Sequence, residues 1–225
     1  MGMTGFEDGH MYGPADEKEA IATIHRSLEL GGNFLDTADL YGPLKNEQLI
    51  AKAISGKRNQ YILASKFGWE IDDNNKVTWA INGKKEYVKK SLERSLKNLN
   101  TDYIDLYYLH RLDKNTPIEE TIEAMSALVK EGKIGYIGLS EVSSDTIRRA
   151  HAVHPVTVVQ SEYSLFERTV EERGILDTLQ DLGIGFVAYS PLGRGFLSGK
   201  IKSIDDLPEH DFRRAIPRFQ GDMFH

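Results

Sequence analysis

Strand-like and helix-like segments alternate along this chain of 225 residues. The strand-like segments are short apolar runs rich in β-branched and aromatic residues, and stretches with a helical spacing of apolar residues separate them. Apolar strands that alternate with helices indicate a parallel sheet covered by helices. The six predicted strands are NFLDTA, YILASKFG, YIDLYYLH, KIGYIGLS, VTVVQSEYS and IGFVAYSPLG.

Helices are predicted wherever apolar residues recur at intervals of three and four residues. In the clearest case, the apolar residues of segment 88–99 form a stripe opposite lysines and a glutamate. Pro117 near a first turn, and Ser143 or Ser144 as a cap, mark the starts of two further helices. The predicted helices contain residues 21–28, 88–99, 118–129, a segment after Ser143, and residues 175–182.

Two folds fit this alternation, a doubly wound sheet and an eight-stranded (β/α)8 barrel. The glycine-rich G-x-G-x-x-G fingerprint of a dinucleotide-binding doubly wound unit follows none of the early strands. Each predicted strand instead ends on a polar functional group, and the catalytic groups of (β/α)8 barrels come from those ends. The α/β class with a TIM barrel is therefore predicted, as one domain over residues 1–225. The polar strand ends are Asp36, Lys66, His110, Ser140, Gln160 and Ser190.

The composition excludes several classes of partner and site. Lys and Arg number 28 against 34 Asp and Glu, which gives a net charge of -6, so nucleic acid is not an expected partner. The chain has no Cys, which excludes disulfides and thiolate metal sites, and we predict no metal. No apolar run approaches the roughly 20 residues that span a bilayer. We expect a soluble, cytoplasmic protein without a membrane partner.

Four polar residues near the strand ends form a plausible reaction centre. A tyrosine has a pKa of about 10 in water, and a neighbouring cation favours its phenolate. Lys66 can supply that charge to Tyr41, Asp36 can hold Lys66 charged, and His110 can donate to a substrate oxygen. Taken singly, each residue has a structural explanation: a strand-end carboxylate, a rim aromatic, a solvated lysine and a core histidine. Together they describe a proton donor beside a polarised carbonyl.

The segments DTADLYG, SKFG, LYYLH, GLS, QSEYS and AYSPLGRGFLSGK resemble the signature segments of the aldo-keto reductase family, in family order and spacing. They are most similar to auxin-induced and perakine-reductase-like NADPH-dependent reductases. The resemblance implies an NADPH-dependent barrel enzyme that reduces aldehydes or ketones to alcohols. By matched position, Tyr41 is its general acid, Lys66 and Asp36 tune that acid, and His110 orients the carbonyl.

The same resemblance implies the NADPH-binding residues. One position departs from many relatives, because Glu141 stands where they have Asn, and a carboxylate cannot donate to an amide oxygen. Ser140 and Gln160 are expected to hold the nicotinamide carboxamide and Tyr189 to stack on the ring. The pyrophosphate is expected to lie along Ser190, Leu192, Gly193 and Arg194.

Compared with the family pattern, the barrel is expected to be incomplete. Residues 1–3 resemble the end of the family's first strand, and no segment resembles its eighth strand. An open seam exposes unpaired edges, so self-association is expected. Two other functions stay open: a nucleotide-binding regulatory module of the channel-subunit kind, and an inactive truncated fragment. The insert around Trp69 and Trp79 suggests an aromatic rim for a small carbonyl substrate, although both could pack on outer loops.

Overall fold

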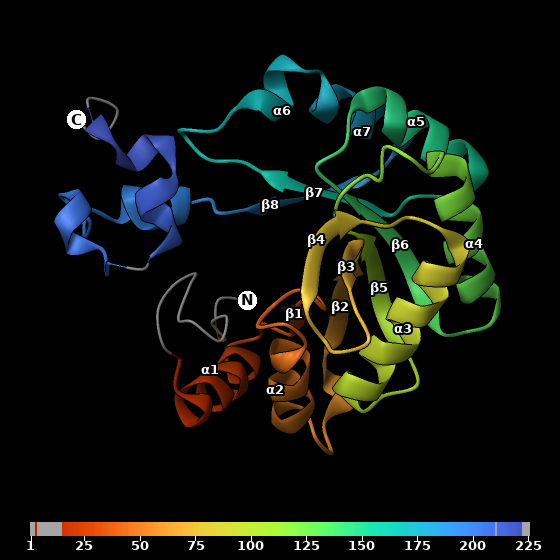
Figure 1. The fold of residues 1–225 in the computed structure, drawn as a ribbon, viewed down its shortest axis with the longest axis horizontal. Helices are drawn as coiled ribbons and strands as arrows, with labels where there is room; N and C mark the ends of the chain where they lie inside the picture. Colours follow the sequence, from red (N-terminus) through yellow and green to blue (C-terminus); the bar gives the residue numbers. More distant parts are fainter. Residues whose placement is uncertain (1–2, 4–14, 210, 222–225) are drawn as a thin grey trace.

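Six parallel strands form the central sheet of the computed structural model, which describes residues 3, 15–209 and 211–221 (Figure 1). The strands follow one another as β1-β2-β5-β6-β7-β8, and each is hydrogen-bonded to the next in this order. All six strands predicted from the apolar runs are confirmed. Their bounds are β1 (Phe34–Asp36), β2 (Ile62–Phe67), β5 (Ile104–Leu109), β6 (Ile134–Ser140), β7 (Val158–Glu162) and β8 (Gly185–Tyr189).

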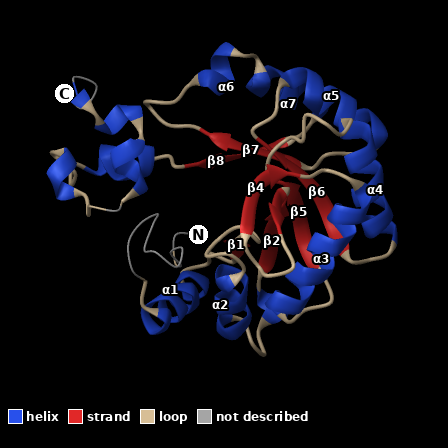
Figure 2. Cartoon of the chain, in the orientation of Figure 1, coloured by secondary structure: helices blue, strands red, loops and turns tan. Residues whose placement is uncertain are grey.

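Helices cover the outer side of the curled sheet (Figure 2). Ser143 caps α5 as predicted, because its Oγ accepts from the Thr146 amide at 3.3 Å. Helices α2 and α6 were not predicted; α6 has only four residues, too short to display a helical period. The helices are α1 (Glu17–Glu29), α2 (Lys45–Ala53), α3 (Lys85–Leu99), α4 (Ile118–Lys130), α5 (Ser144–Val153), α6 (Thr169–Glu172) and α7 (Ile175–Leu182).

The insert that contains both tryptophans is a β-hairpin. Strands β3 (Trp69–Ile71) and β4 (Val77–Ile81) pair antiparallel and form a second, two-stranded sheet. Because β3 starts two residues after the end of β2, the hairpin rises from the C-terminal edge of the main sheet. The Trp69 and Trp79 rings meet edge to face at 5.9 Å.

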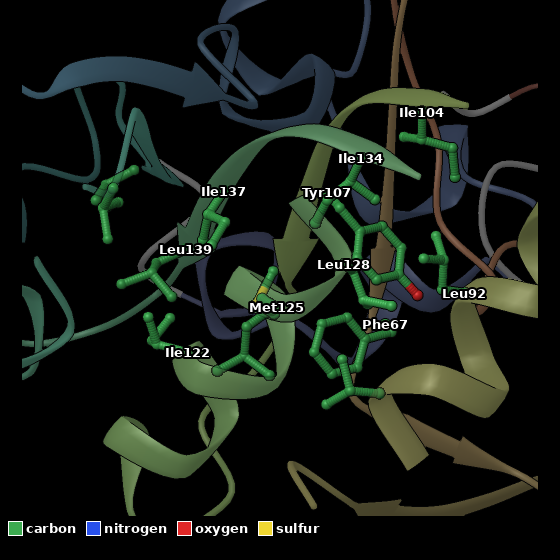
Figure 3. Packing of buried hydrophobic residues seen from close by; sticks show 14 of the residues in the cluster. Phe67, Leu92, Ile104, Tyr107, Ile122, Met125, Leu128, Ile134, Ile137 and Leu139 are labelled. Atoms are coloured by element: carbon green, nitrogen blue, oxygen red, sulfur yellow. The ribbon is translucent and has the colours of Figure 1, made fainter. Parts of the chain in front are cut away.

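The main core lies between the sheet and its helices. In Figure 3, Tyr107 of β5 and Phe67 of β2 lie near Met125 and Leu128 of α4. The two aromatic rings are stacked, with their centroids 5.0 Å apart. These side chains are buried because alternate residues of each strand point toward the helices.

The other residues of each strand point to the inner, concave face of the sheet. A second apolar cluster lies there, made of Ala64, Leu106, Tyr108 and Val158. Within the described residues β1 and β8 are the edges of the sheet, so the barrel is open between them, as the sequence predicted. Of the expected first-strand remnant, residues 1–2 lie outside the described residues, and Met3 packs against the main core. No helix in the described part of the chain has the length and apolar character to cross a bilayer.

Candidate active site

The polar residues at the strand ends converge at the C-terminal edge of the concave face. Asp36 is the last residue of β1, Lys66 lies near the end of β2, and His110 follows β5. Lys66 is fully buried, and its Nζ donates to the Asp36 carboxylate and, at 2.7 Å, to the Thr37 carbonyl. A buried ammonium needs such partners, since its water shell has been removed.

Tyr41 lies on the loop between β1 and α2 and faces both Lys66 and His110. The Lys66 Nζ is 5.2 Å from the centroid of the Tyr41 ring. The Tyr41 and His110 rings meet edge to face, with centroids 5.8 Å apart and planes at 86°. The loop is closed by a 2.8 Å hydrogen bond from the Leu44 amide to the Asp39 carbonyl. The structure thus brings together all four residues of the predicted reaction centre.

Opposite electrostatic effects act on Lys66 and His110. Burial lowers the pKa of Lys66, but the Asp36 carboxylate and Tyr41 outweigh it, so the net pKa is raised and the lysine stays charged. Burial first, and then the charges of Lys66 and Arg111, hold the pKa of His110 well below its ordinary value. His110 is therefore a neutral imidazole at physiological pH, and its Nδ1 has no hydrogen-bond partner among the described residues.

Ser140 and Gln160, the predicted carboxamide ligands, lie side by side as a register pair of β6 and β7. The Gln160 Nε2 donates to Asp36 Oδ2 at 2.9 Å, so Gln160 also contacts the reaction centre. The Ser140 Oγ accepts from Arg111 at 3.3 Å. Glu141 points elsewhere, because its Oε1 accepts from the Glu162 amide at 2.9 Å.

The loop after β8 has a backbone suited to an anion. Ser190, Gly193, Arg194 and Gly195 all have positive φ, and such turns let successive amides form a concave anion site. Arg194 lies 5.7 Å from the Tyr189 ring and donates to Glu162 at 2.9 Å, which anchors the loop. The backbone turns and the arginine fit a pyrophosphate, which is the group that NADPH would bring here.

The predicted residues of this loop differ in burial. Gly193 is buried, whereas the Leu192 side chain is 59% exposed. Any contribution of Leu192 to an anion site would therefore come from its backbone. The positions of Ser190 and Tyr189 next to this loop agree with the predicted order of cofactor contacts, and their roles stay predictions.

Three contributors to the site were missed in the sequence. The Thr37 carbonyl accepts from Lys66, the Tyr108 ring lies 5.6 Å from the Lys66 Nζ, and Arg111 donates to Ser140. Strand alternation was the available signal for Tyr108, which lies two residues before His110 and so shares its face. No sequence pattern marks a carbonyl group as a lysine ligand.

Comparisons with known proteins identify the family. A profile described as the Aldo/keto reductase family matches residues 1–220. The aldo-keto reductase yakc of Schizosaccharomyces pombe, which carries NADP(+) in its name, is 45% identical over 219 residues, or 96% of this chain and 64% of the yeast protein. The chain thus spans about two thirds of the length of that relative.

Solved structures give the same result. A glycerol dehydrogenase from Gluconobacter oxydans superposes with a TM-score of 0.85 at 32% identity, over 96% of this chain and 66% of the other. An aldo-keto reductase from Bacillus halodurans, in its holo form, has a TM-score of 0.75 at 38% identity, over 92% and 66%. The narrower likeness to perakine-reductase-like enzymes stays a prediction. The match over nearly all of the sequence shows that this chain belongs to the aldo/keto reductase family.

Proposed function

We propose that this protein is an NADPH-dependent oxidoreductase that reduces aldehydes or ketones to alcohols, with Tyr41 as the general acid. The observation that carries the proposal is the position of the charged Lys66 beside both Tyr41 and Asp36. A cation next to a phenol stabilises the phenolate that remains after the proton has left.

Each residue of the reaction centre has one task in this scheme. Tyr41 donates its proton to the carbonyl oxygen as the C=O double bond becomes a C–O single bond. His110, neutral because it is buried, donates a hydrogen bond to the same oxygen and orients the substrate. Asp36 keeps Lys66 charged and in place. When bound, NADPH would supply the hydride to the carbonyl carbon, and the products would be an alcohol and NADP(+).

The cofactor assignment rests on the donors of this chain and on its relatives. Ser140 and Gln160, a register pair of β6 and β7, would bind the carboxamide, and the positive-φ turns of residues 190–195 would bind the pyrophosphate. The yeast relative has NADP(+) in its name, and a similar structure from Klebsiella pneumoniae was solved with NADP and acetate. That structure is 28% identical, with a TM-score of 0.70, over 85% of this chain and 63% of the other.

The proposal is tested with Tyr41→Phe, which removes the phenol oxygen and keeps the ring. In a preparation that turns over, NADPH consumption with a panel of aldehydes should fall by at least about 10²-fold, the loss expected of a general acid. NADPH affinity, followed by fluorescence, should change little. The matched control is Tyr136→Phe, since Tyr136 is exposed near the N-terminal end of β6, away from the site.

Turnover of Tyr41→Phe within a few-fold of the parent chain would remove Tyr41 as the acid. NADPH binding without turnover of any aldehyde in the parent chain would favour the regulatory-module alternative. Loss of both binding and turnover in a folded parent chain would favour the inactive alternative.

A further inference from the structure

Helix α3 carries a polar stripe beside its apolar one. Residues spaced by three and four positions share one face of a helix. The apolar stripe places Val88, Leu92 and Leu99 in the main core, and the neighbouring stripe holds several hydroxyls and one guanidinium. The stripe consists of Tyr87, Ser91, Arg94, Ser95 and Asn98.

Arg94 joins two segments that are remote from each other in the sequence. Its Nη1 donates to the Ile71 carbonyl of the β3–β4 hairpin at 3.1 Å. Its Nη2 donates to Asp39 Oδ2 at 3.3 Å, on the loop that carries Tyr41. One planar guanidinium thus holds the tryptophan hairpin and the loop of the proposed acid at once, which the single ammonium of a lysine cannot do in the same geometry.

The hairpin end of this link is reinforced by Tyr87. Its hydroxyl donates to the Trp69 carbonyl at 2.8 Å, accepts from the Ile71 amide at 2.9 Å, and is approached by Arg94 at 3.4 Å. The hairpin therefore rests on α3 through backbone groups. Its Trp79 side chain packs edge to face on Trp69 and is 63% exposed at the rim.

The Asp39 end leads directly to the reaction centre. Its amide donates to the Lys66 carbonyl at 3.1 Å, and its carbonyl accepts from Leu44, which closes the loop around Tyr41. Asp39 is fully buried, and its Oδ1 has no hydrogen-bond partner in the part of the chain that the structure describes. A buried Arg–Asp contact of this kind is a weak source of stability by itself, since well-packed apolar side chains can stabilise a core as well.

We propose that Arg94 is a positioning residue that couples the β3–β4 hairpin to the Tyr41 loop through Asp39. A carbonyl substrate whose ring packs against Trp69 and Trp79 would thereby fix the place of the proton donor. The coupling to turnover rests on the proposed function; the mechanical coupling between the hairpin and the loop does not.

The first test uses no activity. The chain contains 2 Trp, and both lie on the hairpin, so tryptophan emission and its quenching by acrylamide report the hairpin alone. Asp39→Asn should change the quenching constant when Arg94 is present and should add nothing in an Arg94→Lys background. Equal effects of Asp39→Asn in both backgrounds would overturn the coupling.

The second test compares an aromatic with a small aliphatic aldehyde, benzaldehyde and propanal. Arg94→Lys should lower the ratio of kcat for benzaldehyde to kcat for propanal roughly tenfold, as expected for residues coupled through shared contacts, with a smaller change in KM. Arg149→Lys, an exposed arginine on α5, is the matched control and should leave the ratio unchanged.

The outcomes separate this inference from the proposed function. If the ratio of kcat for benzaldehyde to kcat for propanal is unchanged in an active Arg94→Lys variant, Arg94 only stabilises the fold. Equal losses of kcat for both aldehydes would lead to the same conclusion. A parent chain that reduces no aldehyde or ketone of a broad panel but shows the Arg94-dependent quenching would overturn the proposed function and leave the link between hairpin and loop standing.

Discussion

Asp39 is a buried carboxylate that touches one arginine and lies near a second buried acid, Glu47 of α2. Burial, and then the charge of Glu47, raise the pKa of Asp39 to about 8 from 3.8, although Arg94 opposes the shift. Burial raises the pKa of Glu47 as well. Both acids therefore hold protons in the folded chain at pH values where the unfolded chain has released them.

This difference fixes the sign of a stability prediction. The pKa of Asp39 is higher in the folded chain than in the unfolded chain, so proton binding by Asp39 stabilises the fold. This contribution is fully present below pH 3.8 and is lost as the pH rises from 3.8 to about 8. Asp39→Asn should therefore flatten the fall in the free energy of unfolding between about pH 5 and about pH 8. Urea denaturation at both pH values measures it, with the exposed Asp205→Asn as a charge control. An equally steep fall in the free energy of unfolding for Asp39→Asn and for Asp205→Asn would contradict the raised pKa of Asp39.

At the scale of elements, the contact between β5 and β6 depends on a residue without a side chain. Gly138 of β6 pairs with Tyr108 of β5, and a Cβ at Gly138 would come within 2.4 Å of the Tyr108 ring. The same ring lies beside Lys66. The absence of a side chain at Gly138 thus leaves room for the Tyr108 ring beside Lys66.

Gly138→Ala should therefore destabilise the chain by about 1–3 kcal/mol, the usual range for overpacking a core, and should also displace Tyr108 from Lys66. Urea denaturation gives the first effect. Gly185→Ala is the matched control in β8, because the nearest atom to its Cβ would be 3.4 Å away. Equal free energies of unfolding for Gly138→Ala and Gly185→Ala would show that β5 and β6 can accommodate a Cβ at position 138 without a loss of stability.

The elements differ in how far the sequence revealed them. Runs of apolar residues identified all six strands of the main sheet, because a strand covered by helices must be apolar along its length. The strand ends identified Asp36, Lys66 and His110 for the same geometric reason. The hairpin and α2 escaped prediction, since they are short elements that are ordered by contacts with the rest of the fold. The Arg94–Asp39 pair joins residues of separate elements, and no local pattern signals it.

On the scale of the whole molecule, the sheet has one helix-covered face and one concave face. Near the N-terminal ends of the strands the concave face exposes apolar side chains: Phe34 and Ile62 are each 43% exposed, and Tyr136 is 59% exposed. Phe34 and Ile62 are a register pair of β1 and β2, so they form one apolar patch at an edge of the sheet. Within the described residues, the outer backbone groups of β1 and β8 pair with no further strand.

A polypeptide of residues 1–225 should therefore self-associate. At about 25 cal/mol per Å², a few hundred Å² of exposed apolar surface is worth several kcal/mol when buried between copies. Ile62→Lys combined with Phe34→Lys should weaken the association, since charges on an edge oppose pairing. Leu30→Lys, which changes an even more exposed apolar residue at the C-terminal end of α1, should not. Light scattering over a range of concentrations measures the association. A monomer at every concentration would show that the open edges do not drive assembly, whereas equal association of the parent chain and both variants would place the contact elsewhere.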